Sequence, residues 1–211
     1  MTAGALKARL REALRPVGAD DGAAPCSDYD LNPGVERPRR DCVAATVLVA
    51  LVDRPEGVGV ILTRRSDALS RHSGQIAFPG GRIDPGETVV EAALREAWEE
   101  VALDPASVEV LGLSDAYETV TGYRVTPVVG WLATPPVLVA SPDEVAEVFE
   151  TPWDFLMDPA NHRRDHLEAP DGAKRWFWAM PWGDRYIWGA TAGMLRALRR
   201  RLHPEAEGEA A

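Results

Sequence analysis

The segment FPGGRIDPGETVVEAALREAWEEVAL, residues 78–103, joins a turn that cannot be helical to a predicted helix over about residues 88–101. A helix advances about 100° per residue, so the carboxylates of Glu96, Glu99 and Glu100 share one face. Like charges at this spacing repel by a few tenths of a kcal/mol per pair. The opposite face is predicted to pack on a sheet through Val90, Ala93, Leu94, Ala97, Trp98 and Val101.

The crowded carboxylates have two explanations, a solvated acidic surface or a bound cation. The turn before the helix favours the cation, because Gly80 and Gly81 let backbone atoms approach a ligand closely. Hard divalent cations prefer carboxylate oxygens. Arg95 lies beside the acidic face, where it is expected to pair with Glu87 or to orient a catalytic carboxylate. The predicted ligands of Mg²⁺ or Mn²⁺ are Glu96, Glu99 and Glu100.

The composition narrows the class of partner. The chain has 211 residues and a net charge of −10, so a nucleic acid polymer is not an expected partner. Its apolar runs are shorter than the ~18 residues that span a membrane, so no membrane partner is expected either. Cys26 and Cys42 show no zinc-site spacing and are expected to be free thiols in the cytoplasm.

The order of elements predicts an α+β fold with a mixed sheet between helices. Residues 1–40 form an expected N-terminal helix and loop extension, 41–202 the main domain, and 203–211 a polar tail. Strands are predicted over 42–52, 57–65, 75–78, 108–114, 124–133 and 175–180, the first two as a hairpin. Residues 144–156 are predicted to form a strand that runs into a short helix, and further helices are predicted over 3–15 and 186–202.

Gly81, five residues, Glu87, seven residues and then REAWEE, residues 95–100, resemble the Nudix box. That box reads G-x₅-E-x₇-R-E-U-x-E-E-x-G-U, where U is aliphatic. Ala102 stands where the final glycine is usual, which puts the end of the helix in question. The resemblance implies a Nudix-type α/β/α sandwich that hydrolyses a diphosphate linked to another moiety with Mg²⁺ or Mn²⁺.

The segment ILTRRSDALSRHSGQIAFPGG, residues 61–81, resembles the motif upstream of the box in Nudix coenzyme A diphosphatases. Ser70 stands where that motif has a basic residue, and Arg71 follows it. Residues 119–132, 141–152 and 186–198 also resemble this subfamily. Arginine binds phosphate bidentately, although these arginines could also be surface charges. The implied substrate-binding residues are Arg65, Ser66, Arg71, Gly80 and Gly81.

The resemblance implies that water attacks one phosphorus of coenzyme A, giving 3′,5′-ADP and 4′-phosphopantetheine. The proton acceptor stays open among Glu99, Glu100 and Glu144. The expected catalytic residues are Arg95, Glu99, Glu100 and Glu144. The expected partner is a small-molecule diphosphate of coenzyme A type. The sequence leaves the oligomeric state open, with a homodimer as one possibility.

Three alternatives remain. The chain could hydrolyse another nucleotide, such as ADP-ribose or a nucleoside triphosphate; it could be a non-catalytic binding module; or it could be an isomerase of an isoprenoid diphosphate. The late aromatic residues could stack a purine, but core packing is their more common role. They are Trp176, Trp178, Trp182, Tyr186 and Trp188.

Overall fold

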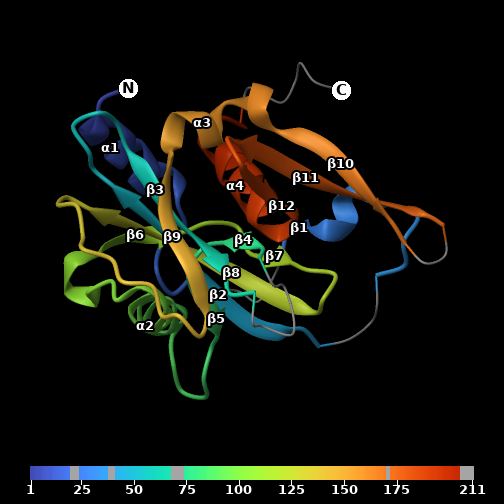
Figure 1. Cartoon of the computed structure of the whole chain (residues 1–211), viewed down its shortest axis with the longest axis horizontal. Coiled ribbons are helices and arrows are strands. Elements are labelled where there is room, and N and C mark those ends of the chain that lie inside the picture. Colours follow the sequence, from blue (N-terminus) through green and yellow to red (C-terminus); the bar gives the residue numbers. More distant parts are fainter. Residues whose placement is uncertain (20–23, 38–40, 68–73, 170–171, 205–211) are drawn as a thin grey trace.

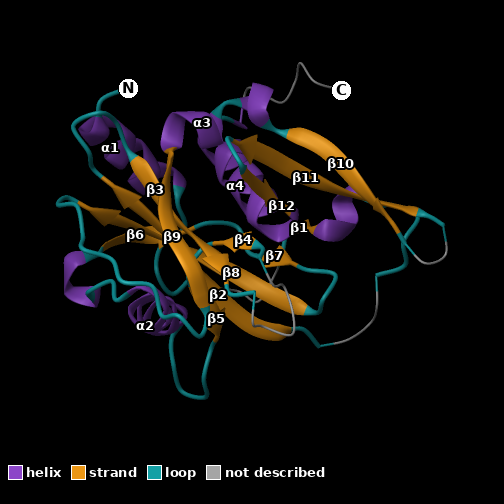
Figure 2. Ribbon diagram, in the orientation of Figure 1, coloured by secondary structure: helices purple, strands orange, loops and turns teal. Residues whose placement is uncertain are grey.

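The computed structural model describes residues 1–19, 24–37, 41–67, 74–169 and 172–204. A nine-stranded mixed sheet lies between helices, and a three-stranded sheet stands beside it (Figures 1 and 2). The large sheet runs β1–β7–β8–β2–β3–β4, while β5 pairs with β2, β6 with β8 and β9 with β3. Its strands are β1 (Cys26–Ser27), β2 (Val43–Val52), β3 (Gly59–Arg65), β4 (Ile76–Ala77), β5 (Gly80–Arg82), β6 (Glu109–Leu113), β7 (Tyr117–Glu118), β8 (Tyr123–Leu132) and β9 (Val145–Pro152).

Two long apolar strands form the centre of this sheet. β2 and β8 run parallel over their whole lengths, from Val43 opposite Tyr123 to Val52 opposite Leu132. Continuous apolar runs are typical of strands that are covered on both faces. The predicted hairpin of β2 and β3 is confirmed, but only Leu51 and Val52 of β2 pair with β3. Beyond that point β3 pairs with β4, and β5 takes the place of β3 on β2. Strand β9 pairs with β3 from Gly59 to Arg65.

Helices cover both faces of the sheet. Helix α2 (Val89–Val101) packs on one face, and α1 (Ala3–Ala13) and α4 (Gly189–Leu202) pack on the other. Each face has its own cluster of buried apolar side chains. These layers confirm the predicted α/β/α arrangement. None of the helices in the described ranges is both long and apolar enough to cross a bilayer.

The N-terminal extension packs on the same core as the rest of the chain. Leu6 and Leu10 of α1 are buried, and burying one leucine side chain contributes about 1.5–3 kcal/mol. β1 pairs in parallel with β7 at the sheet edge, and the 3₁₀ helix η1 (Asp28–Leu31) follows it. The boundary between 1–40 and 41–202 stays a prediction. Of the predicted tail, residues 205–211 lie outside the described residues.

Two features of the late sequence were predicted incorrectly. The predicted helix over 186–202 begins only at Gly189, because the residues before it form the strand β12 (Arg185–Trp188). That strand belongs to a second antiparallel sheet with β10 (Arg163–Glu168) and β11 (Lys174–Trp182), and β10 was not predicted. The residues of β10 are mostly polar and exposed, so no apolar alternation marks it as a strand. The strand–helix transition before 157 is confirmed, with α3 at Trp153–Met157.

The buried stripe of α2 differs from the predicted one. It consists of Ala92, Ala93, Ala97, Glu100 and Val101, so Glu100 belongs to the buried side of the helix. Trp98, which was predicted to pack on the sheet, is 53% exposed. The stripe is centred on small alanines, which let the helix lie close to the sheet and leave no room for an indole. Glu96 and Glu100 therefore lie at the inner edge of the helix, whereas Glu99 is exposed.

Both ends of α2 have identifiable caps. Thr88 accepts a hydrogen bond from the Glu91 N–H, and the Glu91 carboxylate accepts one from the Thr88 N–H, which completes a capping box. At the other end Ala102 adopts the left-handed conformation, with φ 54° and ψ 31°. The chain thus ends this helix with the geometry that a glycine usually supplies, but with a methyl group that opposes it.

We expect Ala102→Gly to raise the free energy of unfolding by about 1 kcal/mol, because glycine has no Cβ to disfavour positive φ. In a chain of this size that corresponds to roughly 2–4 °C in Tm. Ala8→Gly is the matched control, because Ala8 is exposed within α1. That change should destabilise by about 1 kcal/mol. Thermal unfolding in which both substitutions lower Tm would contradict the strained helix end.

Candidate active site

A cleft of about 750 Å³ opens where β3 diverges from β2. This volume is in the range of small-molecule binding sites. Its floor includes Thr46 of β2, one side carries the carboxylates of α2, and another side includes Trp188 at the start of α4. The predicted residues among its lining are Arg65, Gly80, Gly81, Glu96, Glu100 and Glu144.

Gly80 and Gly81 allow α2 to approach β5. A Cβ at Gly81 would lie 2.3 Å from Oε1 of Glu96, and one at Gly80 would lie 2.3 Å from the carbonyl oxygen of Thr46. Both distances are far inside van der Waals contact, and Gly80 also has a φ of 158°. The two glycines are therefore required by the contact between the turn, β2 and the helix.

Glu100 is a buried carboxylate with few compensating contacts. Its Oε2 accepts a hydrogen bond from the Gly80 N–H at 3.3 Å, and its Oε1 lies 3.8 Å from Nη1 of Arg65. Burial raises the pKa of Glu100 to about 7, against the smaller opposing effects of Gly80 and Arg65. Burial also raises the pKa of Glu96. The carboxylates of the cleft are thus only partly hydrated, so their negative charges are less stabilised than they would be in water.

Arg95 organises the remaining acidic side chains. It donates two hydrogen bonds to Glu87, at 2.7 and 3.0 Å, and its Nη1 donates to both Glu96 and Glu99 at 3.0 Å. These contacts hold the pKa of Glu87 below its usual value. Its Nη2 also donates to the carbonyl oxygen of Arg82 at 3.1 Å. The predicted pairing of Arg95 with Glu87 is present. Arg95 also offsets part of the repulsion among the glutamates, which the sequence analysis expected a bound cation to offset.

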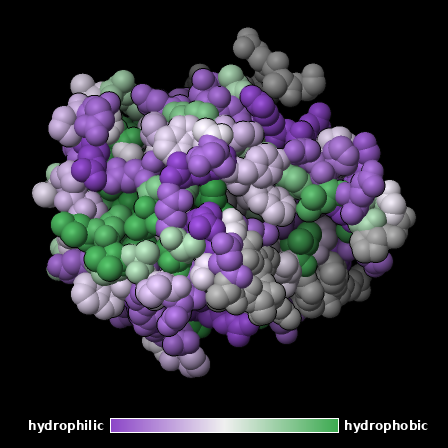
Figure 3. All heavy atoms as spheres, viewed as in Figure 1, coloured by the Kyte–Doolittle hydropathy of each residue, from purple (hydrophilic) through white to green (hydrophobic). Residues whose placement is uncertain are grey.

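The segment between β8 and β9 brings Glu144 to the cleft. Its Ser141 N–H donates to the carbonyl oxygen of Glu100 at 2.8 Å, and the Ser66 N–H donates to the carbonyl oxygen of Glu144 at 2.8 Å. Val137 and Val139 of this segment are exposed, and hydrophobic residues gather on this side of the molecule, to the left in Figure 3. The segment is hydrogen-bonded to the end of α2, and it places Glu144 in the lining of the cleft together with Glu96 and Glu100.

The other predicted residues do not line the cleft directly. Arg95 and Glu99 lie beside it, with Glu99 exposed, while Ser66 is buried at 8% exposure. Arg71 lies outside the described residues. The lining also includes Asp28, Arg82, Tyr123 and Trp188, which were not predicted as site residues from the sequence. Arg82 had a usable signal, because it follows Gly81 directly inside the box.

The acidic side chains fit a hard divalent cation by their chemistry. Glu96 and Glu100 present carboxylate oxygens to one cleft, and the buried Glu100 has only one N–H donor and a distant arginine to compensate its charge. Within the described ranges, no three or more His, Cys, Asp or Glu side chains are already arranged as a closed metal site. Arg95 holds Glu99 and Glu96 on the helix side, so closing a site requires these side chains to turn.

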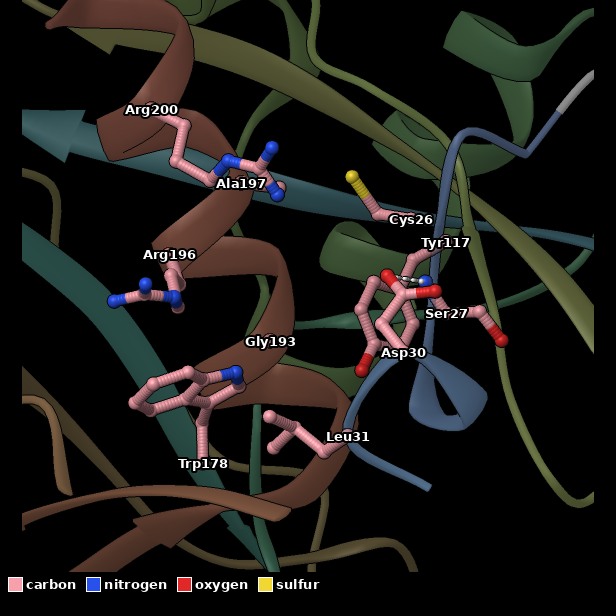
Figure 4. Close-up of a pocket in the computed structure, with 10 residues that line it drawn as sticks. All are labelled: Cys26, Ser27, Asp30, Leu31, Tyr117, Trp178, Gly193, Arg196, Ala197 and Arg200. Carbon is pink, nitrogen blue, oxygen red and sulfur yellow. Dashed lines mark hydrogen bonds between the residues drawn. The ribbon is translucent and has the colours of Figure 1, made fainter. Parts of the chain in front are cut away.

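A second cavity lies between η1, β11 and α4 and is much smaller, at about 150 Å³ (Figure 4). Trp178, Arg196 and Cys26 are among its lining, and the Arg196 guanidinium lies 3.8 Å from the Trp178 ring centroid. Tyr117 also lines this cavity, and its hydroxyl donates a hydrogen bond at 2.9 Å to Asp28, which belongs to the lining of the larger cleft. Its size excludes a dinucleotide-sized ligand, so the larger cleft is the candidate active site.

Comparisons with known proteins agree with this geometry. The profile of the family described as "NUDIX domain" matches residues 43–176. A protein named "Uncharacterized Nudix hydrolase NudL" from Escherichia fergusonii is 43% identical over 175 residues, which cover 82% of this chain and 89% of that protein. The protein of the same name from Escherichia coli O7:K1 gives the same values. The MutT protein of Methanosarcina mazei Go1 has a similar fold, with a TM-score of 0.50 and 19% identity over 81% of this chain and 99% of its own.

Removing the Glu100 charge tests the burial of this carboxylate in metal-free protein. Between pH 4.5, its ordinary pKa, and about 7, the folded state binds more protons than the unfolded state, so stability falls as pH rises. Glu100→Gln lacks this penalty, so its stability advantage over the wild type should grow across that window, to about 3 kcal/mol at most.

Glu87→Gln is the control, because Arg95 lowers the pKa of Glu87 and thereby stabilises the fold above pH 4.5. Glu87→Gln should lose stability relative to the wild type as pH rises through that carboxyl's titration. Denaturant unfolding in EDTA from pH 4 to 8 measures both differences. A constant difference between Glu100→Gln and the wild type would show that Glu100 is hydrated.

Proposed function

We infer that the cleft is the active site of a hydrolase, because this chain belongs to the Nudix hydrolase family. It is therefore a Nudix hydrolase, an enzyme that acts on a small-molecule nucleoside diphosphate derivative. We propose that the substrate is coenzyme A or one of its derivatives. Hydrolysis of its diphosphate yields 3′,5′-ADP and 4′-phosphopantetheine, or the acylated form of the latter.

The observation that carries this proposal is the position of Arg65. It ends β3 within the motif upstream of the box, and its Nη1 lies near the buried Glu100 in the cleft. Its side chain is 29% exposed and belongs to the lining of the cleft. An arginine that is partly accessible beside the carboxylates is suited to bind a diphosphate oxygen.

Most other residues of the upstream motif have structural roles. Leu62 and Phe78 belong to the core, and the buried Thr63 hydroxyl donates to the carbonyl oxygen of Ala77 at 3.2 Å. These contacts join β3 to β4 and fix where Arg65 and Gly80 enter the cleft. The motif therefore supports the proposal of a coenzyme A substrate mainly because its buried residues position Arg65 and Gly80 in the cleft.

The protein side chains divide the chemical work. When held by Glu96, Glu99 and Glu100, Mg²⁺ or Mn²⁺ would offset charge on the diphosphate and acidify a water molecule. Arg95 positions Glu96 and Glu99 through the hydrogen bonds that it donates to them. Arg65 orients a phosphate so that water can attack the phosphorus and displace the other phosphate as leaving group.

Glu144 is our choice for the residue that accepts the proton of this water. Glu99 is held by Arg95, and Glu100 contacts Gly80 and Arg65. Glu144 lines the cleft with an exposed side chain, and within the described residues no ion pair or hydrogen bond engages its carboxylate. It can therefore turn toward water without breaking another contact. The cytoplasm as compartment and a homodimer as assembly stay predictions.

Identification of the products tests the reaction directly. Purified protein with Mg²⁺ or Mn²⁺ should convert coenzyme A to 3′,5′-ADP and 4′-phosphopantetheine, with one ¹⁸O from labelled water in one product per attack. Mass spectrometry of a panel that includes ADP-ribose and nucleoside triphosphates should rank coenzyme A first by kcat/KM. A higher kcat/KM for ADP-ribose or a nucleoside triphosphate would contradict the proposal that coenzyme A is the substrate, whereas the hydrolytic mechanism would still hold.

We expect Glu144→Gln to lower kcat by about 10²–10⁴-fold with a small change in KM, the usual contribution of a general base. Asp143→Asn is the matched control, because Asp143 is the exposed neighbouring acid and does not belong to the cleft lining. It should leave kcat near the wild-type value. If Glu144→Gln retains wild-type kcat, another carboxylate accepts the proton.

A further inference from the structure

Arg82 and Tyr123 form a pair on the wall of the cleft that the proposed mechanism does not use. Nη2 of Arg82 donates a hydrogen bond to the Tyr123 hydroxyl at 3.0 Å, and the guanidinium lies 5.6 Å from the ring centroid. Both side chains line the cleft, and Arg82 is exposed. A guanidinium over a tyrosine ring keeps its full charge, because its partner is neutral.

The charges along the cleft distinguish Arg82 from Arg65. Arg65 lies 3.8 Å from the Glu100 carboxylate, whereas in the described part of the chain Arg82 has no acidic side chain within ion-pair distance. Several other arginines of this acidic chain are paired with carboxylates, including Arg54 with Glu150. Arg82 therefore presents an uncompensated positive charge and a set of N–H donors to whatever enters the cleft.

The backbone of Arg82 is held firmly while its side chain remains accessible. Arg82 pairs with Ala45 in the sheet, and its carbonyl oxygen accepts a hydrogen bond from Arg95. It lies two residues beyond Gly80, about 7 Å along the strand and on the same face by the alternation of β side chains. Gly80 itself contacts Glu100, so Arg82 stands beside the carboxylates but separate from them.

We propose that Arg82, held by Tyr123, binds a second phosphate of the substrate, one outside the diphosphate that is cleaved. This inference rests on the proposed function, and in coenzyme A the group is the 3′-phosphate. The 3′-phosphate and the diphosphate are carried by the same ribose, so their binding groups must stand within one sugar's reach of each other. Arg82 and the carboxylate end of the cleft meet that requirement, and Arg82 thereby selects coenzyme A over dephospho-coenzyme A.

Kinetics with the two substrates separates the roles of the arginines. A hydrogen bond to a charged group is worth a factor of roughly 10–150 in rate. Arg82→Ala should therefore lower kcat/KM for coenzyme A by about that factor, and lower it for dephospho-coenzyme A by a few-fold at most. Arg65→Ala should lower kcat/KM for both substrates alike. Arg64→Ala is the matched control, because Arg64 is paired with Asp67 outside the cleft lining and should change neither value.

Two further variants test the geometry of the pair. Arg82→Lys keeps the charge but loses the planar fork, so it should recover only part of the preference for coenzyme A. Tyr123→Phe keeps the ring and removes the hydroxyl that holds Arg82, and it should reduce the same preference by a smaller factor. An Arg82→Ala variant that slows both substrates equally would overturn the proposal, as would one that slows neither.

Product binding gives a readout that does not depend on turnover. By calorimetry, wild-type protein should bind 3′,5′-ADP at least 10-fold more tightly than 5′-AMP, and Arg82→Ala should abolish this difference. Retention of the difference in Arg82→Ala would refute the assignment. If the wild-type protein hydrolyses neither coenzyme A nor dephospho-coenzyme A, the proposed function fails, and this binding comparison still decides whether Arg82 reads the 3′-phosphate.

Discussion

The close approach of helix α2 to strand β5 is the constraint on which the site depends. Alanines form most of the buried stripe of the helix, and Gly80 and Gly81 leave no side chain on the facing turn. As a result the Glu100 carboxylate is almost entirely buried, accepts a hydrogen bond from a backbone N–H and lies 3.8 Å from Arg65. A side chain at Gly81 would collide with the Glu96 carboxylate, and one at Gly80 would collide with the backbone of β2. The repulsion and the raised pKa of Glu100 are consequences of this packing.

The positions of two arginines determine the surroundings of each acidic side chain in the site. Arg95 holds Glu87, Glu96 and Glu99 together on the helix side, and Arg65 approaches Glu100 from β3. Glu144 arrives on a separate segment, which is attached to α2 through the Ser141 hydrogen bond. A substrate that carries several phosphates can enter this acidic chain because the cleft offers arginines from two strands, β3 and β5, beside the carboxylates. The net charge of the whole protein says little about the field inside this one cleft.

The elements that could be predicted are those in which local pattern and tertiary packing agree. β2 and β8 are continuous apolar runs, and α2 combines a glycine-rich start with regular apolar spacing. The prediction that Trp98 packs on the sheet was wrong, because the three glutamates of α2 suggest one fully solvated polar face. In the structure the boundary between the buried and the exposed side of α2 runs between these glutamates, with Glu100 on the buried side. β10 and the start of α4 were missed for a related reason: exposed strands of mixed character carry little periodicity. The place of Arg82 inside the box was a usable signal, but its contact with Tyr123 was not, because Tyr123 lies 41 positions away in the sequence.

The most direct test is anomalous diffraction from crystals grown with Mn²⁺ and 3′,5′-ADP. We expect a manganese peak bounded by Glu96, Glu99 and Glu100, with the 3′-phosphate against the Arg82 guanidinium and the 5′-phosphate on the Arg65 side. A manganese peak away from these carboxylates would contradict the central claim that the packing of α2 on β5 builds the reaction centre. A nucleotide bound outside the cleft would contradict it equally.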